Sequence, residues 1–369
     1  MDPGQRSEPD DALKPSTLRE ISAHSWRYLA RRTLHEFLRD DCLDLAAGLT
    51  YYAVLAVLPG LIAVIALLGV LGKGPESVAT ILGLARQVVP ASALGILQPV
   101  VEGRIQTPRA TLALVLGILG ALWFVSGYVT AFGRVMNQIY AIAEGRPIWK
   151  LQPLMILVTL VLGVLCLCAV LLLLISGPLA RAIGNVLGLG STAVLVWTIV
   201  RWRVMVAITG MVITLLYYVT PNVRQPRFRW LSSGAVLATV VWLAASALFG
   251  LFVANFSNFD ATYGSLAGAI VFLVWLWLTN TAVLLGAGAE AEIERARELQ
   301  AGVVAERHVQ LPARDTRGSR KRSAQRQQDL AAGREIRQQH DQTEDQAVAC
   351  ASCRHAGSCC LDPMVARGP

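Results

Sequence analysis

Uncharged apolar runs constrain this chain more than any other feature of its sequence. Between residues 45 and 295 the charged side chains fall into a few short clusters. The stretches between these clusters are about 20 residues long, the length at which a helix crosses a hydrocarbon layer of ~30 Å. Only 16% of the 369 residues are charged, against about a quarter in soluble domains. The pattern excludes a soluble globular protein, a collagen-like repeat and a disulfide-rich miniprotein. It predicts an all-α, polytopic membrane protein with soluble ends.

Six membrane spans are expected within residues 45–295, which we take as the membrane domain. Their predicted ranges are 49–71, 111–132, 154–175, 204–219, 230–253 and 265–289. Arginines crowd the start of the fourth span, so residues 192–200 are either its upper half or a separate interfacial piece. Between the first two spans, residues 72–110 contain two apolar stretches separated by Pro90. Each is too short to cross the bilayer, which predicts interfacial or re-entrant helices.

Lysine and arginine residues sort the loops by side of the membrane. The loops after the second and fourth spans are basic, whereas the loop after the fifth span contains neither Lys nor Arg. By the positive-inside rule, the two basic loops and both termini are expected in the cytoplasm. No uninterrupted apolar run precedes the first span, so we expect that span to be retained rather than cleaved as a signal peptide.

Two polar segments flank the membrane domain. In residues 1–44, apolar side chains such as Trp26 and Leu29 share a helical face, with arginines largely opposite. This predicts an amphipathic helix that either lies on the headgroups or packs against the bundle. Residues 296–369 show little apolar periodicity and predict a disordered, basic cytoplasmic tail. Its cysteines are either a short zinc knuckle or incidental: Cys350, Cys353, Cys359 and Cys360.

Isolated polar residues in and next to the apolar spans are candidates for lining a substrate groove. They are Tyr51, Tyr52, Pro59, Tyr263 and Asn280. The alternative roles are structural, since a tyrosine can anchor a helix at the membrane interface and a proline can kink it. A buried amide in lipid must find a partner, so Asn280 should face the bundle in either case.

A second group of polar residues is expected on the cytoplasmic side. Its members are Asn137, Tyr140, Glu144 and Arg146 after the second span, and Arg224 and Arg227 after the fourth. A network of these side chains would fix the topology or bind lipid headgroups. Alternatively, it would hold the phosphate or carboxylate of an anionic substrate.

Several short motifs follow one another along the membrane domain. They are Leu49-Thr50-Tyr51-Tyr52, Glu144-Gly145-Arg146-Pro147, residues 217–222, Tyr263-Gly264-Ser265-Leu266, Trp275-Leu276-Trp277 and residues 284–287. Together they resemble the YihY/BrkB family of bacterial inner-membrane proteins. The resemblance implies six spans and a plasma-membrane location. One branch of that family is named as a virulence factor, another carried a ribonuclease label now regarded as mistaken, and transport is proposed for the family without an established substrate. This chain departs from the family pattern at Gly288 and Glu290, where the pattern has an acid and an asparagine.

Catalysis is not expected of this chain. A metal-dependent nuclease needs clustered His, Asp or Glu ligands, whereas the five histidines lie widely spaced in the polar ends. We expect no metal, no cofactor and no nucleic acid partner. The partners to consider are membrane lipids, a small solute or lipid as substrate, and a second copy of the chain.

The expected function is transport or translocation of a small, amphipathic or anionic solute or lipid. The centres of the spans contain no ionisable residue, which disfavours proton coupling through a buried carboxylate and favours facilitated passage. The alternative is a virulence-associated envelope scaffold that does not transport, and a membrane ribonuclease comes third.

Overall fold

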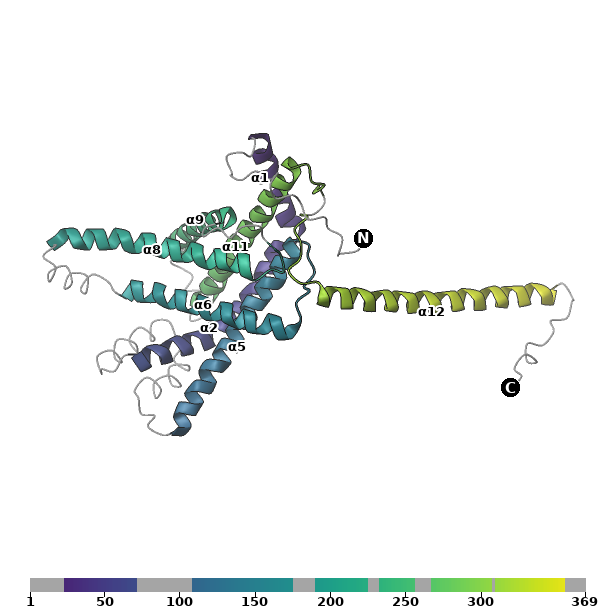
Figure 1. The fold of residues 1–369 in the computed structure, drawn as a ribbon, viewed down its shortest axis with the longest axis horizontal. Coiled ribbons are helices and arrows are strands. Elements are labelled where there is room, and N and C mark those ends of the chain that lie inside the picture. Colours follow the sequence, from purple (N-terminus) through teal and green to yellow (C-terminus); the bar gives the residue numbers. More distant parts are fainter. Residues whose placement is uncertain are drawn as a thin grey trace. The chain divides into compact units, whose positions relative to one another are not determined.

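The computed structural model describes residues 23–71, 108–174, 190–224, 232–255, 267–306 and 309–355. In these ranges the regular elements are helices, and one isolated antiparallel bridge joins Val223 to Ala313. The all-α fold class is therefore confirmed. Backbone contacts divide the chain into two compact units, Met1–Asp315 and Thr316–Pro369. The helices are α1 (Ala23–Arg39), α2 (Cys42–Leu71), α5 (Pro108–Ile139), α6 (Ile148–Leu174), α8 (Gly190–Val219), α9 (Ser233–Asn255), α11 (Ala267–Gln300) and α12 (Arg317–His355) (Figure 1).

Five of the described helices are long and apolar enough to cross a membrane, as expected of a multi-pass protein. Their spanning ranges are Leu119–Ile139, Ile148–Leu172, Ile199–Val219, Ser233–Asn255 and Ala267–Gln300. The number of spanning helices within the described residues is therefore one fewer than the six spans expected. Helix α2 has 30 residues, but the apolar part of it that can be assessed, Cys42–Val57, is shorter than a span. The helices expected between the first two spans lie in residues 72–107, outside the described residues.

Helix α8 settles the ambiguity at the start of the fourth span. It is continuous from Gly190 to Val219, so residues 192–200 form the upper part of one helix rather than a separate interfacial piece. Beyond the first turn of a continuous helix every N–H group bonds internally, so the N–H groups of residues 194–200 have helical partners.

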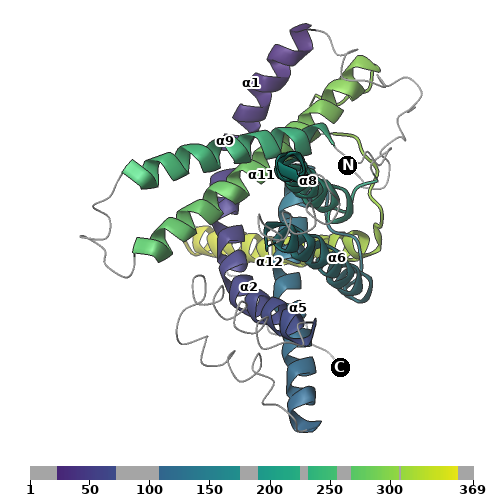
Figure 2. The ribbon, with the colours of Figure 1, turned by 90° about the vertical axis from the view of Figure 1, so that its left-hand side faces the viewer.

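The core of the first unit is concentrated at one end of the helices, which we call the closed end. At this end α2, α6 and α9 begin and α5, α8 and α11 finish. In two perpendicular views the helices diverge from this region (Figures 1 and 2). The large side chains buried there include Leu49, Val129, Phe132, Met136, Met155, Tyr217 and Leu284. Toward the opposite ends, exposed apolar side chains include Leu119, Trp123, Val170, Ile199, Leu248, Leu251 and Phe272.

Helices α9 and α11 approach each other through two glycines. A Cβ atom on Gly234 would lie 2.4 Å from the carbonyl oxygen of Gly286, and a Cβ on Gly286 would lie 2.5 Å from the Cβ of Ala238. Tyr217 of α8 donates a hydrogen bond to the carbonyl oxygen of Val283 beside this crossing. Lipid tails are as apolar as the helices, so the hydrophobic effect does not drive membrane helices together. Close packing and interhelical hydrogen bonds must therefore hold α9 and α11 against each other.

Helix α11 ends at Gln300, and Gly302 just beyond it has a φ of 78°, which suits glycine. After residue 300 the structure contains regular elements where a disordered tail was expected. The following segment packs back on the first unit and buries Val309 and Leu311. Residues Arg317–His355 then form α12. Low apolar periodicity predicted disorder, but a few apolar side chains suffice to fix the first segment, and mixed charges on a helix can support each other one turn apart.

The amphipathic helix expected in residues 1–44 is α1, followed by a sharp turn at Asp41, whose φ is 50°. Its Leu29 packs with Ile293 and Ala296 of α11, so the helix packs against the bundle, which was one of the two expected arrangements. Its other face exposes Leu34 and Leu38.

Candidate polar site at the closed end

The loop after α5 is organised around Glu144. Asn137, near the end of α5, donates a hydrogen bond of 2.8 Å from Nδ2 to Glu144 Oε2. Arg146 donates from Nε to Glu144 Oε1 and from Nη2 to Oε2, both at 2.8 Å. A two-point contact of this kind fixes the plane of the guanidinium group as well as its position. Arg146 also donates to the carbonyl oxygen of Thr220 at 2.6 Å, which joins this loop to the end of α8.

The environment of Glu144 favours its charged form. Burial alone would raise the pKa of this carboxyl, but hydrogen bonds from the Arg146 side chain and backbone, together with the charge of Arg146, outweigh burial and lower the pKa. Arg146 itself is 9% exposed. The pair is thus a largely buried ion pair whose charges are matched and hydrogen-bonded, the condition under which such a pair is tolerated.

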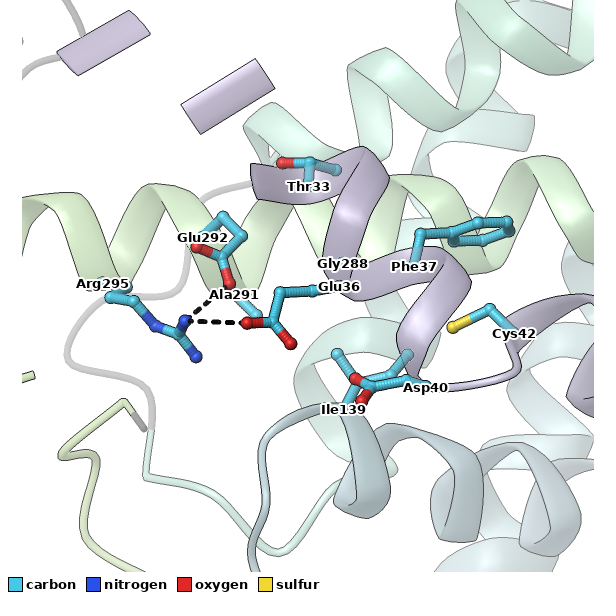
Figure 3. Close-up of a pocket in the computed structure, with 10 residues that line it drawn as sticks. All are labelled: Thr33, Glu36, Phe37, Asp40, Cys42, Ile139, Gly288, Ala291, Glu292 and Arg295. Atoms are coloured by element: carbon cyan, nitrogen blue, oxygen red, sulfur yellow. Dashed lines mark ion pairs between the residues drawn. The ribbon is translucent and has the colours of Figure 1, made fainter. Parts of the chain in front are cut away.

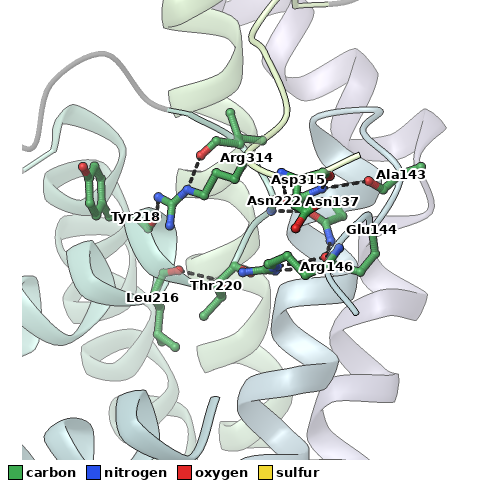
Figure 4. A network of polar contacts seen from close by, with 11 residues as sticks. Asn137, Ala143, Glu144, Arg146, Leu216, Tyr218, Thr220, Asn222, Arg314 and Asp315 are labelled. Carbon is green, nitrogen blue, oxygen red and sulfur yellow. Dashed lines mark hydrogen bonds and ion pairs between the residues drawn. The ribbon is translucent and has the colours of Figure 1, made fainter. Parts of the chain in front are cut away.

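Asn222 connects this loop to the C-terminal side of the first unit. Its backbone N–H donates to Asn137 Oδ1 at 2.7 Å, and its side-chain amide donates to the carbonyl oxygens of Ala143 and Asp315 at 3.2 and 2.8 Å. The backbone N–H of Asp315 donates in return to Asn222 Oδ1 at 3.1 Å. Asn222 is fully buried. One asparagine therefore bridges three chain segments that are far apart in the sequence (Figure 4).

Residues 309–315, which we call the C-terminal clasp, lie along the loop after α8. Arg314 donates from its backbone N–H to the carbonyl oxygen of Asn222 and from Nε to that of Val223, at 3.1 and 2.7 Å. Its guanidinium also donates to the carbonyl oxygen of Tyr218 and lies 5.2 Å from the centre of that ring. The backbone N–H of Arg224 donates to the carbonyl oxygen of Pro312 at 2.9 Å. The clasp is thus held mainly through backbone groups.

The structure joins three of the six residues predicted for the cytoplasmic network, Asn137, Glu144 and Arg146. Tyr140 is 2% exposed and belongs to the hydrophobic core. The side chain of Arg224 is exposed, and Arg227 lies outside the described residues. The prediction missed Thr220, Asn222, Arg314 and Asp315. The Pro221-Asn222 pair is a turn signal that pointed to this loop, whereas nothing local in the sequence pointed to the clasp.

The candidate groove residues are not brought together as a set. Asn280 is 3% exposed and faces the bundle as predicted, because its Oδ1 accepts from the hydroxyl of Tyr128 at 2.8 Å and its Nδ2 donates to Thr50 Oγ1 at 3.0 Å. Tyr52 accepts a hydrogen bond from Arg134. Tyr51 is 62% exposed. Pro59 is half-buried within α2, and Tyr263 lies outside the described residues.

A small cavity of about 30 Å³ lies between α1 and α11 (Figure 3). Arg295 Nη1 lies 3.1 Å from Glu292 Oε1 and 3.9 Å from Glu36 Oε1 at its wall. Asp40 lies at the end of α1 on the same cavity, where burial and the neighbouring Glu36 raise its pKa. A space of this size suits about two water molecules. The acid–arginine contacts hold α1 against α11.

Glu290, one of the two departures from the family pattern, has a clear structural role. Its Oε2 accepts hydrogen bonds from the backbone N–H of Gly234 at 2.5 Å and from the hydroxyl of Ser233 at 3.3 Å. The first N–H groups of a helix lack partners within that helix. A carboxylate there satisfies them and suits the positive end of the helix dipole. Glu290 of α11 thus caps α9.

The described residues hold no group of three or more His, Cys, Asp or Glu side chains arranged to bind a metal ion. The side chains of the four tail cysteines, Cys350, Cys353, Cys359 and Cys360, lie outside the described residues, so the zinc-knuckle alternative is untested.

Comparison with known proteins decides the affiliation of the chain. Residues 33–309 match the family model described as Virulence factor BrkB. The chain belongs to this family. YfkH of Bacillus subtilis, a BrkB relative described as ribonuclease-like, is 30% identical over 270 residues, which are 73% of this chain and 94% of YfkH. No solved structure matches the chain.

Other relatives of this BrkB-family chain are described as UPF0761 membrane proteins. One from Alkalilimnicola ehrlichii is 30% identical over 275 residues, 70% of this chain and 56% of that protein. One from Aromatoleum aromaticum is 30% identical over 291 residues, 74% of this chain and 67% of that protein. The chain thus spans little more than half of the Alkalilimnicola protein. The family match ends at residue 309, so most of the clasp and all of α12 lie beyond it.

Proposed function

We propose that this BrkB-family protein crosses a bacterial inner membrane six times, with both termini in the cytoplasm, and translocates a small solute or a lipid. In this proposal α2 is the first span, and the closed end faces the cytoplasm. The substrate is amphipathic or anionic, and its passage is not coupled to a carboxylate within the centres of the spans.

The observation that carries the proposal is the uneven burial of the helices along their length. The polar site and the clasp tie the helices together at the closed end, where Phe132, Met155 and Tyr217 are fully buried. Farther along the helices, Leu248, Leu251 and Trp123 are 68%, 62% and 59% exposed. A bundle that served only as an anchor would gain stability by packing along its whole length. Translocation instead needs helices that are held at one end and can separate at the other. The apolar surfaces suit an acyl chain.

The orientation of the proposal rests on where the cations lie. Arg134, Lys150, Arg224 and Arg314 all belong to the closed end. Positive charge concentrates on the cytoplasmic side of inner-membrane proteins. The exposed Leu34 and Leu38 of α1 add an apolar surface at the same end, which suits a helix lying at the level of the headgroups.

Translocation can be tested in proteoliposomes that contain the purified full chain. Fluorescent short-chain phospholipids and small anions would be assayed for flux above that of protein-free vesicles. To restrict separation away from the closed end, Ser246→Cys and Trp275→Cys would be joined by a bifunctional methanethiosulfonate reagent, whose length replaces the indole ring that reaches from Trp275 to within 3.4 Å of Ser246 Oγ. The seven native cysteines would first be replaced by serine.

We expect flux by the reduced double variant and at least a tenfold loss after crosslinking, with recovery upon addition of a reductant. The same molecule in its reduced form is the control for folding. Flux indistinguishable from that of empty vesicles for every lipid and anion would overturn the proposal. Equal flux in the crosslinked and reduced forms would show that these helices need not separate.

A non-transporting envelope scaffold is the second candidate. It is favoured by α12, a polar helix that belongs to a compact unit of its own and lies beyond the family match. Deletion of residues 316–369 distinguishes the two functions. A scaffold loses its cellular phenotype although the shortened chain still inserts into the membrane, whereas a translocator keeps both its phenotype and its flux.

A catalytic role is not part of this proposal, because the histidines are confined to the two ends of the sequence and water activation by a metal needs clustered ligands. Cleavage of RNA by the purified protein with any divalent metal would require a nuclease function to be added.

A further inference from the structure

Helix α12 carries its charges unevenly along its length. Residues 317–326 contain five cations and no acid: Arg317, Arg320, Lys321, Arg322 and Arg326. All five side chains are exposed. We call these residues the basic patch. Residues 329–345 contain five acids and two arginines, namely Asp329, Arg334, Glu335, Arg337, Asp341, Glu344 and Asp345. The formal charge therefore changes from +5 in the first segment to −3 in the second, counting histidine as neutral.

The basic patch begins two residues after a fixed point of the first unit. Asp315 is held by Asn222 through two hydrogen bonds of 2.8 and 3.1 Å. Arg317 follows two residues later, and an extended chain of that length spans only about 7 Å. The nine helical steps from Arg317 to Arg326 add about 14 Å. Whatever direction α12 takes, its basic patch stays within about 21 Å of the clasp.

The clasp lies where membrane helices end. Its partners Tyr218 and Asn222 are at the end of α8 and just beyond it, and the spanning range of that helix finishes at Val219. A lipid headgroup surface is therefore the anionic partner present at high local concentration around the patch. Each Lys or Arg close to an anionic membrane surface strengthens binding about fivefold, which corresponds to about 1 kcal/mol.

The charge reversal along α12 favours a membrane over a nucleic acid as the partner of the basic patch. A long polyanion that followed the helix axis would meet the acidic second segment and be repelled there. A membrane surface needs to touch only the first three turns, and the acidic segment can project away from it. The cations also lie around the helix rather than on one face, since Arg317 and Lys321 are one turn apart while Arg322 and Arg326 are roughly opposite. Such a distribution suits a fluid layer of headgroups better than one bound phosphate.

We propose that the basic patch, residues 317–326, binds the anionic lipid headgroups of the membrane that holds the bundle. The acidic second segment keeps the rest of α12 off that surface and available to the aqueous phase. This inference does not depend on translocation, since it concerns a different segment and a different ligand.

Amide hydrogen exchange on the full chain in lipid nanodiscs tests the proposal. Discs of pure phosphatidylcholine would be compared with discs that contain phosphatidylglycerol. We expect exchange in residues 317–326 to slow at least fivefold in the anionic discs, with residues 330–345 unchanged. The protection should vanish in about 1 M NaCl, where the Debye length falls to about 3 Å.

Two matched variants make the test specific. Neutralising Arg320, Lys321, Arg322 and Arg326 by glutamine should abolish the difference between the two kinds of disc, whereas Arg334→Gln with Arg337→Gln should leave it unchanged. Equal exchange of the wild-type patch in both discs would overturn the proposal. So would protection by added RNA at concentrations where the anionic discs give none, because the partner would then be a nucleic acid. Protection that rises with protein concentration in both kinds of disc would mean that the basic patch binds the acidic segment of a second copy of the chain. That result would also overturn the proposal.

Discussion

Replacement of Asn222 by alanine should release the C-terminal clasp without unfolding the bundle. The substitution removes three side-chain hydrogen bonds, with Ala143 O and with Asp315 O and N–H, at 3.2, 2.8 and 3.1 Å. Each such bond contributes about 1 kcal/mol net, and buried partners left unsatisfied add to the loss. We therefore expect about 3 kcal/mol, which is about a hundredfold in the equilibrium for local opening. Two of the three bonds hold Asp315, so most of the loss falls on the clasp.

Amide hydrogen exchange in detergent micelles reads this opening at two defined sites. The N–H of Arg314 bonds to Asn222 O, and the N–H of Arg224 bonds to Pro312 O, so both amides exchange only when the clasp leaves the loop. Both should exchange about a hundredfold faster in Asn222→Ala, while amides in the centre of α11 stay unchanged. Asn255→Ala is the matched control, because the side chain of Asn255 is exposed and, among the described residues, bonds to Leu251 O one turn away.

Two outcomes would refute this reasoning about the clasp. Exchange at Arg314 and Arg224 within threefold of wild type would mean that the backbone contacts and the Arg314 side chain hold the clasp without Asn222. Faster exchange throughout α5, α8 and α11 would mean that the clasp and the bundle open as one cooperative unit.

Three further predictions concern the packing and the ion pair. Gly286→Ala should lower the melting temperature in detergent far more than Gly288→Ala, because a Cβ at Gly286 would meet three atoms within 2.7 Å whereas Gly288 has open space; equal melting temperatures would contradict the α9–α11 crossing. Asn280→Leu should cost about 1 kcal/mol of bundle stability, and a double-mutant cycle with Tyr128→Phe should show coupling through their 2.8 Å hydrogen bond. Because the native pKa of Glu144 is lowered, its stabilising contribution is complete above the ordinary pKa and is lost as pH falls through the native one. Acid unfolding curves of wild type and Glu144→Gln should accordingly converge at low pH and separate near neutrality.

The membrane helices could be predicted from the sequence because a helix that crosses lipid must consist mostly of apolar residues. Asn280 is a clear case: an amide within an apolar helix must find a partner, so its orientation toward the bundle followed from one residue, and only the identities of Tyr128 and Thr50 needed the structure. Arg146 was predicted to join a polar network, and the members expected from the next basic loop were arginines. The structure instead provides the carbonyl oxygen of Thr220 as the acceptor. Because every residue has a backbone carbonyl, the residue types in the sequence do not reveal such a partner.

The clasp was missed for the same physical reason. Arg314 and Asp315 occur in a polar stretch whose composition predicts disorder, yet they are fixed because their backbone groups meet the loop after α8. Asn255 and Tyr51 illustrate the converse, since both are polar residues of apolar helices that have no tertiary role visible in the described residues: Asn255 bonds within its own helix and Tyr51 is 62% exposed. Polar residues in spans are informative only when burial forces them to pair.

The clasp gives the polar site a role that its individual bonds do not reveal. Asn222 joins the loop after α5 to the residues that lead directly into α12, so the first unit and the basic patch share one fixed chain segment. In the proposed lipid contact, a fixed Asp315 would reduce the conformational freedom that the basic patch loses when it binds headgroups, and headgroup binding would in turn restrain the clasp. Because only Thr316 lies between the two contacts, each would raise the effective concentration of the other. The buried Glu144–Arg146 pair sets the end of α8 through Thr220 O and fixes the loop that holds the clasp through Asn222.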